Sequence, residues 1–82
     1  MGIKYSLHAR RRLAARDISE AMIEAVIVQP DWETTDPSDL QLTRAFKWIS
    51  NTDQVLRVVY RRLADGDVLI VTAFPDRNAE RS

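Results

Sequence analysis

A histidine and several arginines recur at helical spacing near the start of the 82-residue chain. His8, Arg12 and Arg16 stand at positions i, i+4 and i+8, so a helix would place all three on one face. That face is not a core face, because buried unpaired charge costs too much free energy. Guanidinium groups bind phosphates and an imidazole moves protons near neutral pH. The pattern predicts an anion-binding stripe with a proton carrier; the alternative is a set of solvated side chains.

A second set of cationic and hydroxyl groups lies in the second half of the chain. Arg57 and Arg61 share one side of the longest predicted strand, and Thr72 stands near the end of the last strand. An arginine and a hydroxyl on one sheet face can orient a phosphate and stabilise the charge of a phosphorane. Arg11 and Lys47 are expected to join Arg57 in binding a polyanion such as RNA. The alternative is that the strand arginines are only solvated.

Two helices are predicted to carry the first half of the chain. Ser6 is the expected N-cap of a helix that runs to about Ala15. Asp17 or Ser19 is expected to cap the second helix, with Asp17 and Glu20 forming a variant of the capping box. The apolar residues that recur at helical spacing in this second helix are Met22, Ile23, Val26 and Ile27.

The second half of the chain has the alternation that is typical of strands. Four strands are expected, over residues 32–35, 43–50, 54–63 and 68–74. The pair Asp65-Gly66 indicates a tight hairpin before the last strand, which is apolar on both faces and should lie inside the sheet. The order predicts an α+β domain with both helices on one face of a mostly antiparallel four-stranded sheet. We expect one domain over 1–82, with an ordered core of about 3–75 and a frayed tail over 76–82.

Composition narrows the class of function. Twelve basic residues balance twelve acidic ones, and the chain has no cysteine and one histidine, so disulfides, thiolate sites and histidine-rich metal sites are excluded. No cofactor is expected. No run of residues suits a membrane span or a signal peptide, which predicts a cytoplasmic protein. Basic residues gather in 1–16 and 42–63 and acidic ones in 17–41, which predicts a basic and an acidic face unless these blocks neutralise each other.

Several of these residues form a motif that is known from a protein family. The chain resembles the domain-of-unknown-function family 4258 from Tyr5 to about Phe74. The N-terminal match consists of Ser6-Leu7-His8-Ala9, Arg12, Arg16-Asp17-Ile18-Ser19, Val26 and Pro30. The strand matches are Leu56-Arg57-Val58-Val59 and Val71-Thr72-Ala73-Phe74, where Phe74 replaces a frequent tyrosine.

This family is grouped with the barnase–EndoU–colicin–RelE-like (BECR) ribonuclease toxins, which are small α+β domains. The resemblance implies a metal-independent endoribonuclease that is paired with an antitoxin protein. It carries over His8, Arg12, Arg16 and Thr72 as active-site positions, whereas Arg57 and Arg61 come from strand geometry alone. The expected reaction is attack of the RNA 2′-OH on the phosphate, with His8 as the proton carrier and the arginines holding the phosphate.

Two other classes of function remain open at this point. One is a nucleic-acid-binding module without catalysis, in which Trp32, Phe46 and Trp48 could stack on bases. The other is a protein-interaction domain that forms a homodimer or binds another protein. That domain would use an exposed edge of the strand 68–74, or exposed Trp32 and Trp48.

Overall fold

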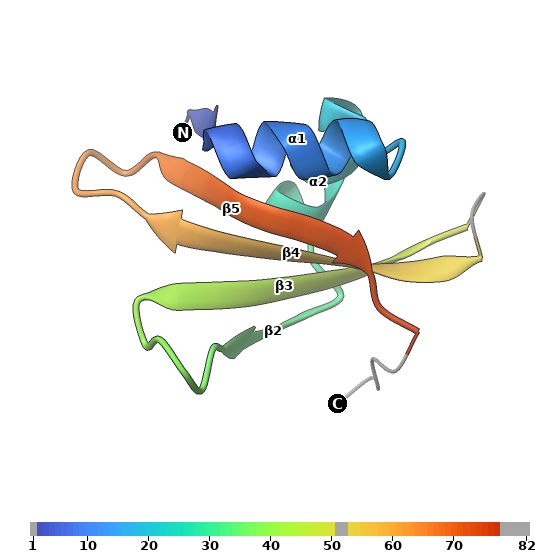
Figure 1. Cartoon of the computed structure of the whole chain (residues 1–82). Coiled ribbons are helices and arrows are strands. Elements are labelled where there is room, and N and C mark those ends of the chain that lie inside the picture. The colour runs from blue at the N-terminus through green and yellow to red at the C-terminus, as the bar shows by residue number, and fades with distance from the viewer. Residues whose placement is uncertain (1, 51–52, 78–82) are drawn as a thin grey trace.

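Five strands and two helices make up the part of the chain that the computed structural model describes, which is residues 2–50 and 53–77. The elements are β1 (Ile3–Tyr5), α1 (Leu7–Ala15), α2 (Glu20–Val28), β2 (Trp32–Thr35), β3 (Leu42–Ile49), β4 (Gln54–Arg62) and β5 (Val68–Pro75). They form one sheet in the order β1-β5-β4-β3-β2 (Figure 1). The α+β class is confirmed, but the sheet has five strands rather than four.

The strand that the sequence did not indicate is β1, which runs parallel to β5. Ile3 pairs with Val68 and Tyr5 with Ile70, while the other neighbouring strands pair antiparallel. Three residues are too few for an alternation pattern, and their pairing partners lie at the far end of the chain. Because β1 covers the outer edge of β5, the last strand lies inside the sheet, as its two apolar faces predict.

The two helices begin where small hydroxyl side chains cap them. The Ser6 hydroxyl accepts a hydrogen bond from the Ala9 amide at 3.0 Å, as predicted. The Ser19 hydroxyl accepts one from the Met22 amide at 3.2 Å and is the cap of α2. The predicted capping box at Asp17 is wrong, because Asp17 has a left-handed backbone (φ 54°) in the turn between the helices.

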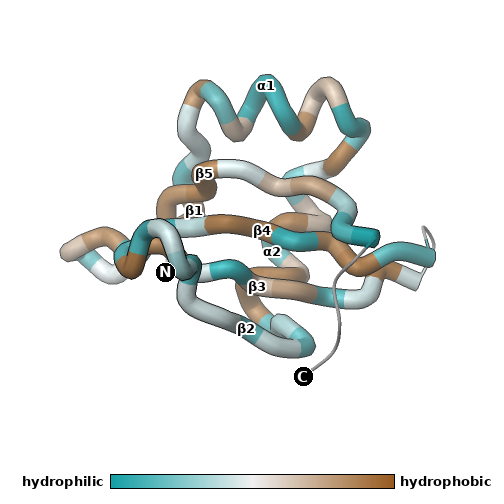
Figure 2. The backbone as a smooth tube through the Cα atoms, turned by 60° about the horizontal axis from the view of Figure 1, so that its bottom comes forward, coloured by the Kyte–Doolittle hydropathy of each residue, from teal (hydrophilic) through white to brown (hydrophobic). Residues whose placement is uncertain are grey.

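Both helices pack on the same face of the sheet and form the core with it. In the described residues α1 lies along β5 and α2 crosses β3 and β4, so the opposite face has no helix over it (Figures 1 and 2). Ile23 and Val26 of α2 are fully buried, as predicted. The residues that join them in the core include Ala9, Leu13, Ala45, Leu56, Val58, Tyr60, Val68, Ile70 and Ala73.

An irregularity in β5 decides which of its side chains reach the uncovered face. Val59 pairs with Thr72 but Tyr60 pairs with Ile70, so Val71 is an extra residue in β5. Ile70 and Ala73 both face the core, although strict alternation would separate them. The bulge therefore turns Thr72 to the uncovered face.

The sequence predicts a frayed tail after β5, but the first residue of this tail is fixed to the sheet. The Asp76 amide donates to the Val55 carbonyl at 2.8 Å, and Asp76 is buried. The prediction of fraying is therefore wrong for Asp76; residues 78–82 lie outside the described part. In that part no helix is long and apolar enough to cross a membrane.

Candidate functional site

A line of aromatic and cationic side chains crosses the uncovered face of the sheet. The register places Trp32, Phe46, Arg57 and Phe74 opposite one another on β2, β3, β4 and β5. The Trp32 and Phe46 rings are stacked, with centroids 4.7 Å apart and planes 6° from parallel. The Arg16 guanidinium extends the line, 5.6 Å from the Phe74 centroid. We call these five residues the open-face row.

Arg57 is the central cation of the open-face row and is held on every side. Its guanidinium carbon lies 5.4 Å from the Phe46 centroid and 4.9 Å from the Phe74 centroid. Its Nη2 donates to the buried Asp76 carboxylate, while its buried Nε has no hydrogen-bond partner among residues 2–50 and 53–77. Packing and pairing therefore fix the position of this positive charge on the face.

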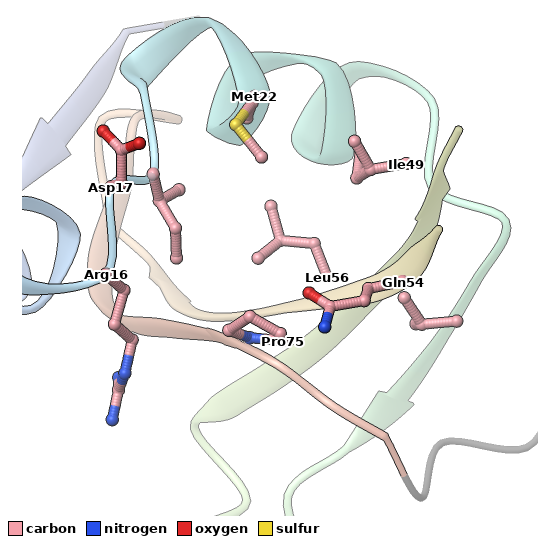
Figure 3. A pocket seen from close by; sticks show the side chains of 9 residues that line it. Arg16, Asp17, Met22, Ile49, Gln54, Leu56 and Pro75 are labelled. Atoms are coloured by element: carbon pink, nitrogen blue, oxygen red, sulfur yellow. The ribbon is translucent and has the colours of Figure 1, made fainter. Parts of the chain in front are cut away.

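Arg16 reaches the row from the end of α1. It is the C-cap residue of the helix, and its Nη1 donates to the Ala73 carbonyl of β5 at 3.1 Å. A small pocket of about 70 Å³ lies on the helix side of this point, lined largely by apolar groups such as Met22, Ile49 and Leu56. Figure 3 shows the Arg16 guanidinium pointing away from these side chains. The Arg16 guanidinium thus lies on the open face rather than in the pocket.

His8 and Arg12 lie on the same flank of α1 as Arg16. Both are exposed, and Arg12 Nε donates to His8 Nε2 at 3.4 Å. The three residues therefore share one flank of the helix, with Arg16 at the row and His8 about two helical turns away.

Thr72 and Arg61 share the face of the open-face row. Thr72 is half-buried beside Val59, on the side to which the β5 bulge turns it. Arg61 is exposed and pairs in register with Leu42 and Leu69 at the far end of β4. Its side chain makes no hydrogen bond or ion pair within residues 2–50 and 53–77. The face thus combines a fixed cation, a hydroxyl and a solvated cation.

Lys47 and Arg11, two of the residues that the sequence predicts to bind RNA, lie elsewhere, and so does Tyr60. Lys47 is on the helix side of the sheet, where its Nζ donates to the Gln29 carbonyl at the end of α2 (2.9 Å). Arg11 lies on α1 opposite the buried Ala9 and Leu13, so it faces away from the sheet. The Tyr60 hydroxyl, on the core side, donates to Glu33 at 2.5 Å. Burial and the nearby Glu33 carboxylate raise the pKa of Tyr60.

Sequence reasoning missed three contributors to this face. The sequence analysis treats Phe74 only as a replacement for a frequent tyrosine and places Asp76 in the tail, yet both contact Arg57. Arg44 lies on the face two residues before Phe46, where strand alternation alone places it, and its Nε donates to the Asp36 carboxylate at 3.2 Å. The described residues contain no cluster of three or more potential metal ligands.

Asp36 is predicted to make the stability of the fold dependent on acid pH. Its carboxylate accepts from the Ser38 hydroxyl at 2.6 Å and the Ser38 amide at 2.8 Å, and these bonds, with Arg44, lower its pKa from 3.8 to about 2. Because the folded pKa is depressed, this stabilisation is present above about pH 4 and is lost as the pH falls through 2. Asp36→Asn should therefore flatten the fall in unfolding free energy between pH 4 and 2.

Urea unfolding at a series of pH values measures this effect. Ser38→Ala keeps the Asp36 carboxylate but removes the shortest hydrogen bond to it. The slope of unfolding free energy against pH in this variant should therefore lie between those of the wild type and Asp36→Asn. A wild-type slope in Asp36→Asn would contradict the prediction.

Comparison with known proteins supplies one match. The model of a family described as a domain of unknown function (DUF4258) matches residues 5–75. Searches of curated proteins and of solved structures each found no match. The matched segment contains both helices and all but the first residues of the sheet, including the whole open-face row. The chain therefore belongs to the DUF4258 family.

Proposed function

We propose that this chain is a metal-independent endoribonuclease of the RelE/BECR-like toxin kind, which binds single-stranded RNA on the open face of its sheet. The resemblance to ribonuclease toxins also implies an antitoxin protein as partner, and the proposal includes the cytoplasmic location that the sequence predicts. Cleavage would proceed by attack of the 2′-OH on the adjacent phosphate.

The open-face row is the observation that carries this proposal. Proteins that bind single-stranded RNA combine exposed π surfaces with guanidinium groups, because bases stack and phosphates pair with cations. The row supplies the guanidinium groups of Arg16 and Arg57 and the half-buried rings of Trp32 and Phe74, on a face that neither helix covers. The third ring, Phe46, is buried. Arg16 and Arg57 would bind phosphates, with Thr72 donating a further hydrogen bond.

In this proposal His8 is the group that moves the proton. Its Nε2, which now accepts from Arg12, would accept the 2′-OH proton as the O2′–P bond forms. Arg12 would then turn to the phosphate, where its charge stabilises the phosphorane. The P–O5′ bond breaks, and the 5′-oxygen takes a proton from solvent. The products are a 2′,3′-cyclic phosphate and a 5′-hydroxyl.

The direct test is incubation of the purified chain with a labelled single-stranded RNA in EDTA. A 2′,3′-cyclic phosphate end that forms in EDTA would support the proposal, because this chemistry needs no metal ion. Intact RNA after prolonged incubation at saturating protein, or cleavage that EDTA abolishes, would contradict it.

Arg61 and Arg11 form a matched pair for testing which face binds RNA. Both are exposed arginines, but Arg61 lies on the open face and Arg11 on the outer side of α1. Arg61→Ala is expected to weaken RNA binding and to reduce the slope of log affinity against log salt by about 1, as for one lost phosphate contact. Arg11→Ala should retain the wild-type slope. Fluorescence anisotropy at several salt concentrations measures both, and equal effects would argue against the open face.

RNA binding without cleavage is the second candidate function. It is favoured by the distance between the row and His8, since His8 stands eight positions before Arg16 and the row needs no proton carrier. This candidate predicts salt-sensitive RNA binding that yields no products. The EDTA experiment separates it from the nuclease.

A further inference from the structure

Strand β2 is an outer strand of the sheet, and within residues 2–50 and 53–77 no other strand pairs with its outer edge (Figure 1). The Asp36 amide, just after β2, donates to the Leu42 carbonyl at 3.0 Å. Because antiparallel pairing alternates along a strand, Thr34 also turns its amide and carbonyl to β3, whereas Glu33 and Thr35 turn theirs outward. The edge therefore presents two amides and two carbonyls to which a further strand can bind.

The segments next to β2 add exposed apolar side chains to this edge. Val28, the last residue of α2, is 72% exposed, and Leu40, in the loop between β2 and β3, is 80% exposed. One of them precedes β2 and the other follows it. Apolar groups at both ends of an unpaired edge favour a contact with protein over a contact with a polyanion.

The edge of β2 is complementary to a second copy of itself. When Glu33 of one copy pairs with the partner's Thr35, two-fold symmetry repeats the pair, and four main-chain hydrogen bonds form. The register with Glu33 opposite Glu33 sets like charges directly against each other. The register with Thr35 opposite Thr35 sets Pro37, which has no N–H, against Glu33 and leaves the Glu33 carbonyl without a donor. Only the first register joins all the outward groups without a charge conflict.

The side chains around the edge suit this register. Thr34 lies opposite the partner's Thr34, which is a favourable cross-strand pair. The Tyr60 hydroxyl donates to the Glu33 carboxylate at 2.5 Å and so holds this charge toward β4, away from the edge. Since the two strands run antiparallel, the segment before one β2 meets the segment after the other, which brings Val28 toward the partner's Leu40.

We infer that two copies of this chain pair through the edges of their β2 strands, antiparallel, with Thr34 on the two-fold axis. The two five-stranded sheets then form one continuous sheet. Opposite residues of antiparallel strands point to the same face, so the two open faces lie on the same side of this sheet. This pairing does not depend on the proposed RNA function.

Disulfide formation tests the register directly, because the chain has no cysteine of its own. Thr34→Cys and Thr35→Cys each place a thiol at an exposed position of β2. In the inferred dimer the thiols of Thr34→Cys lie in a non-hydrogen-bonded pair, whose Cα atoms are about 4.5 Å apart, whereas the thiol of Thr35→Cys lies opposite Glu33. In a glutathione redox buffer we expect Thr34→Cys to form the covalent dimer at least about tenfold faster, since the other pair exceeds the Cα separation that a disulfide tolerates.

Sedimentation equilibrium over a range of concentrations tests the dimer without a cross-link. Leu40→Glu should raise the dimer dissociation constant about tenfold or more, because it removes an apolar contact and adds charge at the edge. The matched control is Leu7→Glu, which changes another exposed leucine, on α1 at the other side of the sheet, and should leave the dissociation constant unchanged.

Three results would overturn this inference: equal rates of disulfide formation in the two cysteine variants, equal effects of Leu40→Glu and Leu7→Glu, or a wild-type chain that stays monomeric at about 1 mM. A monomeric wild type would leave the edge of β2 to a strand of a different protein.

Discussion

Replacing Arg57 with methionine is expected to lower the unfolding free energy by about 3–5 kcal/mol, the usual cost of breaking a buried ion pair from one side. The Asp76 side chain is 8% exposed and that of Arg57 is 23% exposed, so the remaining carboxylate would stay buried without its main counter-charge. Methionine keeps much of the volume between the Phe46 and Phe74 rings and contacts aromatic rings well. The loss should therefore come from charge rather than from packing.

Urea unfolding of a double-mutant cycle checks this expectation. The double variant Arg57→Met/Asp76→Asn removes both charges, so it should recover at least half of the stability lost in Arg57→Met. A loss below about 1 kcal/mol in the single variant would show that the pair is solvated, since that is the range of surface ion pairs. RNA affinity should remain low in the double variant even where stability returns, because the central cation of the row is still missing.

The parts of the fold that the sequence predicts are those with strong local signals. Ser6 precedes a helical pattern by one residue, and Gly66 follows Asp65 between two β-rich runs, so the cap and the hairpin were both expected. Ile3–Tyr5 has no such signal, because three residues do not show a period and the partner strand starts at Val68. The capping box predicted at Asp17 was wrong for a related reason. The Asp17 side chain suits a cap, but the backbone uses this residue where a positive φ is needed.

The candidate site also has parts that local sequence patterns predict and parts that they do not. The helical spacing of His8, Arg12 and Arg16 predicts their common flank, and strand alternation predicts that Arg57 and Arg61 share a face. Alternation alone cannot place Phe74 with Arg57, because the sequence shows neither the register of β4 against β5 nor the extra residue in β5. The contact of Arg16 with Phe74 joins residues that are 58 positions apart, so only the folded chain brings the helix stripe and the strand arginines together.

His8→Gln is expected to reduce the rate of RNA cleavage by about 10²–10⁴-fold, which is the usual contribution of a positioned general base. Stability should change by less than about 0.5 kcal/mol, because His8 is exposed and glutamine can still accept a hydrogen bond from Arg12. Single-turnover cleavage at saturating protein measures the rate. Added imidazole should restore part of the rate in the variant, because free imidazole can replace the missing proton acceptor.

Arg12→Gln is the matched control, because it changes the neighbouring residue on the same flank to the same side chain. Its effect should be a lower rate that added imidazole does not restore, since Arg12 would stabilise the phosphorane without moving the proton. An unchanged cleavage rate in His8→Gln would remove His8 from the mechanism and leave cleavage to another group on the open face. Rescue by imidazole in His8→Gln alone would separate proton transfer, which belongs to the helix flank, from phosphate binding, which belongs to the row.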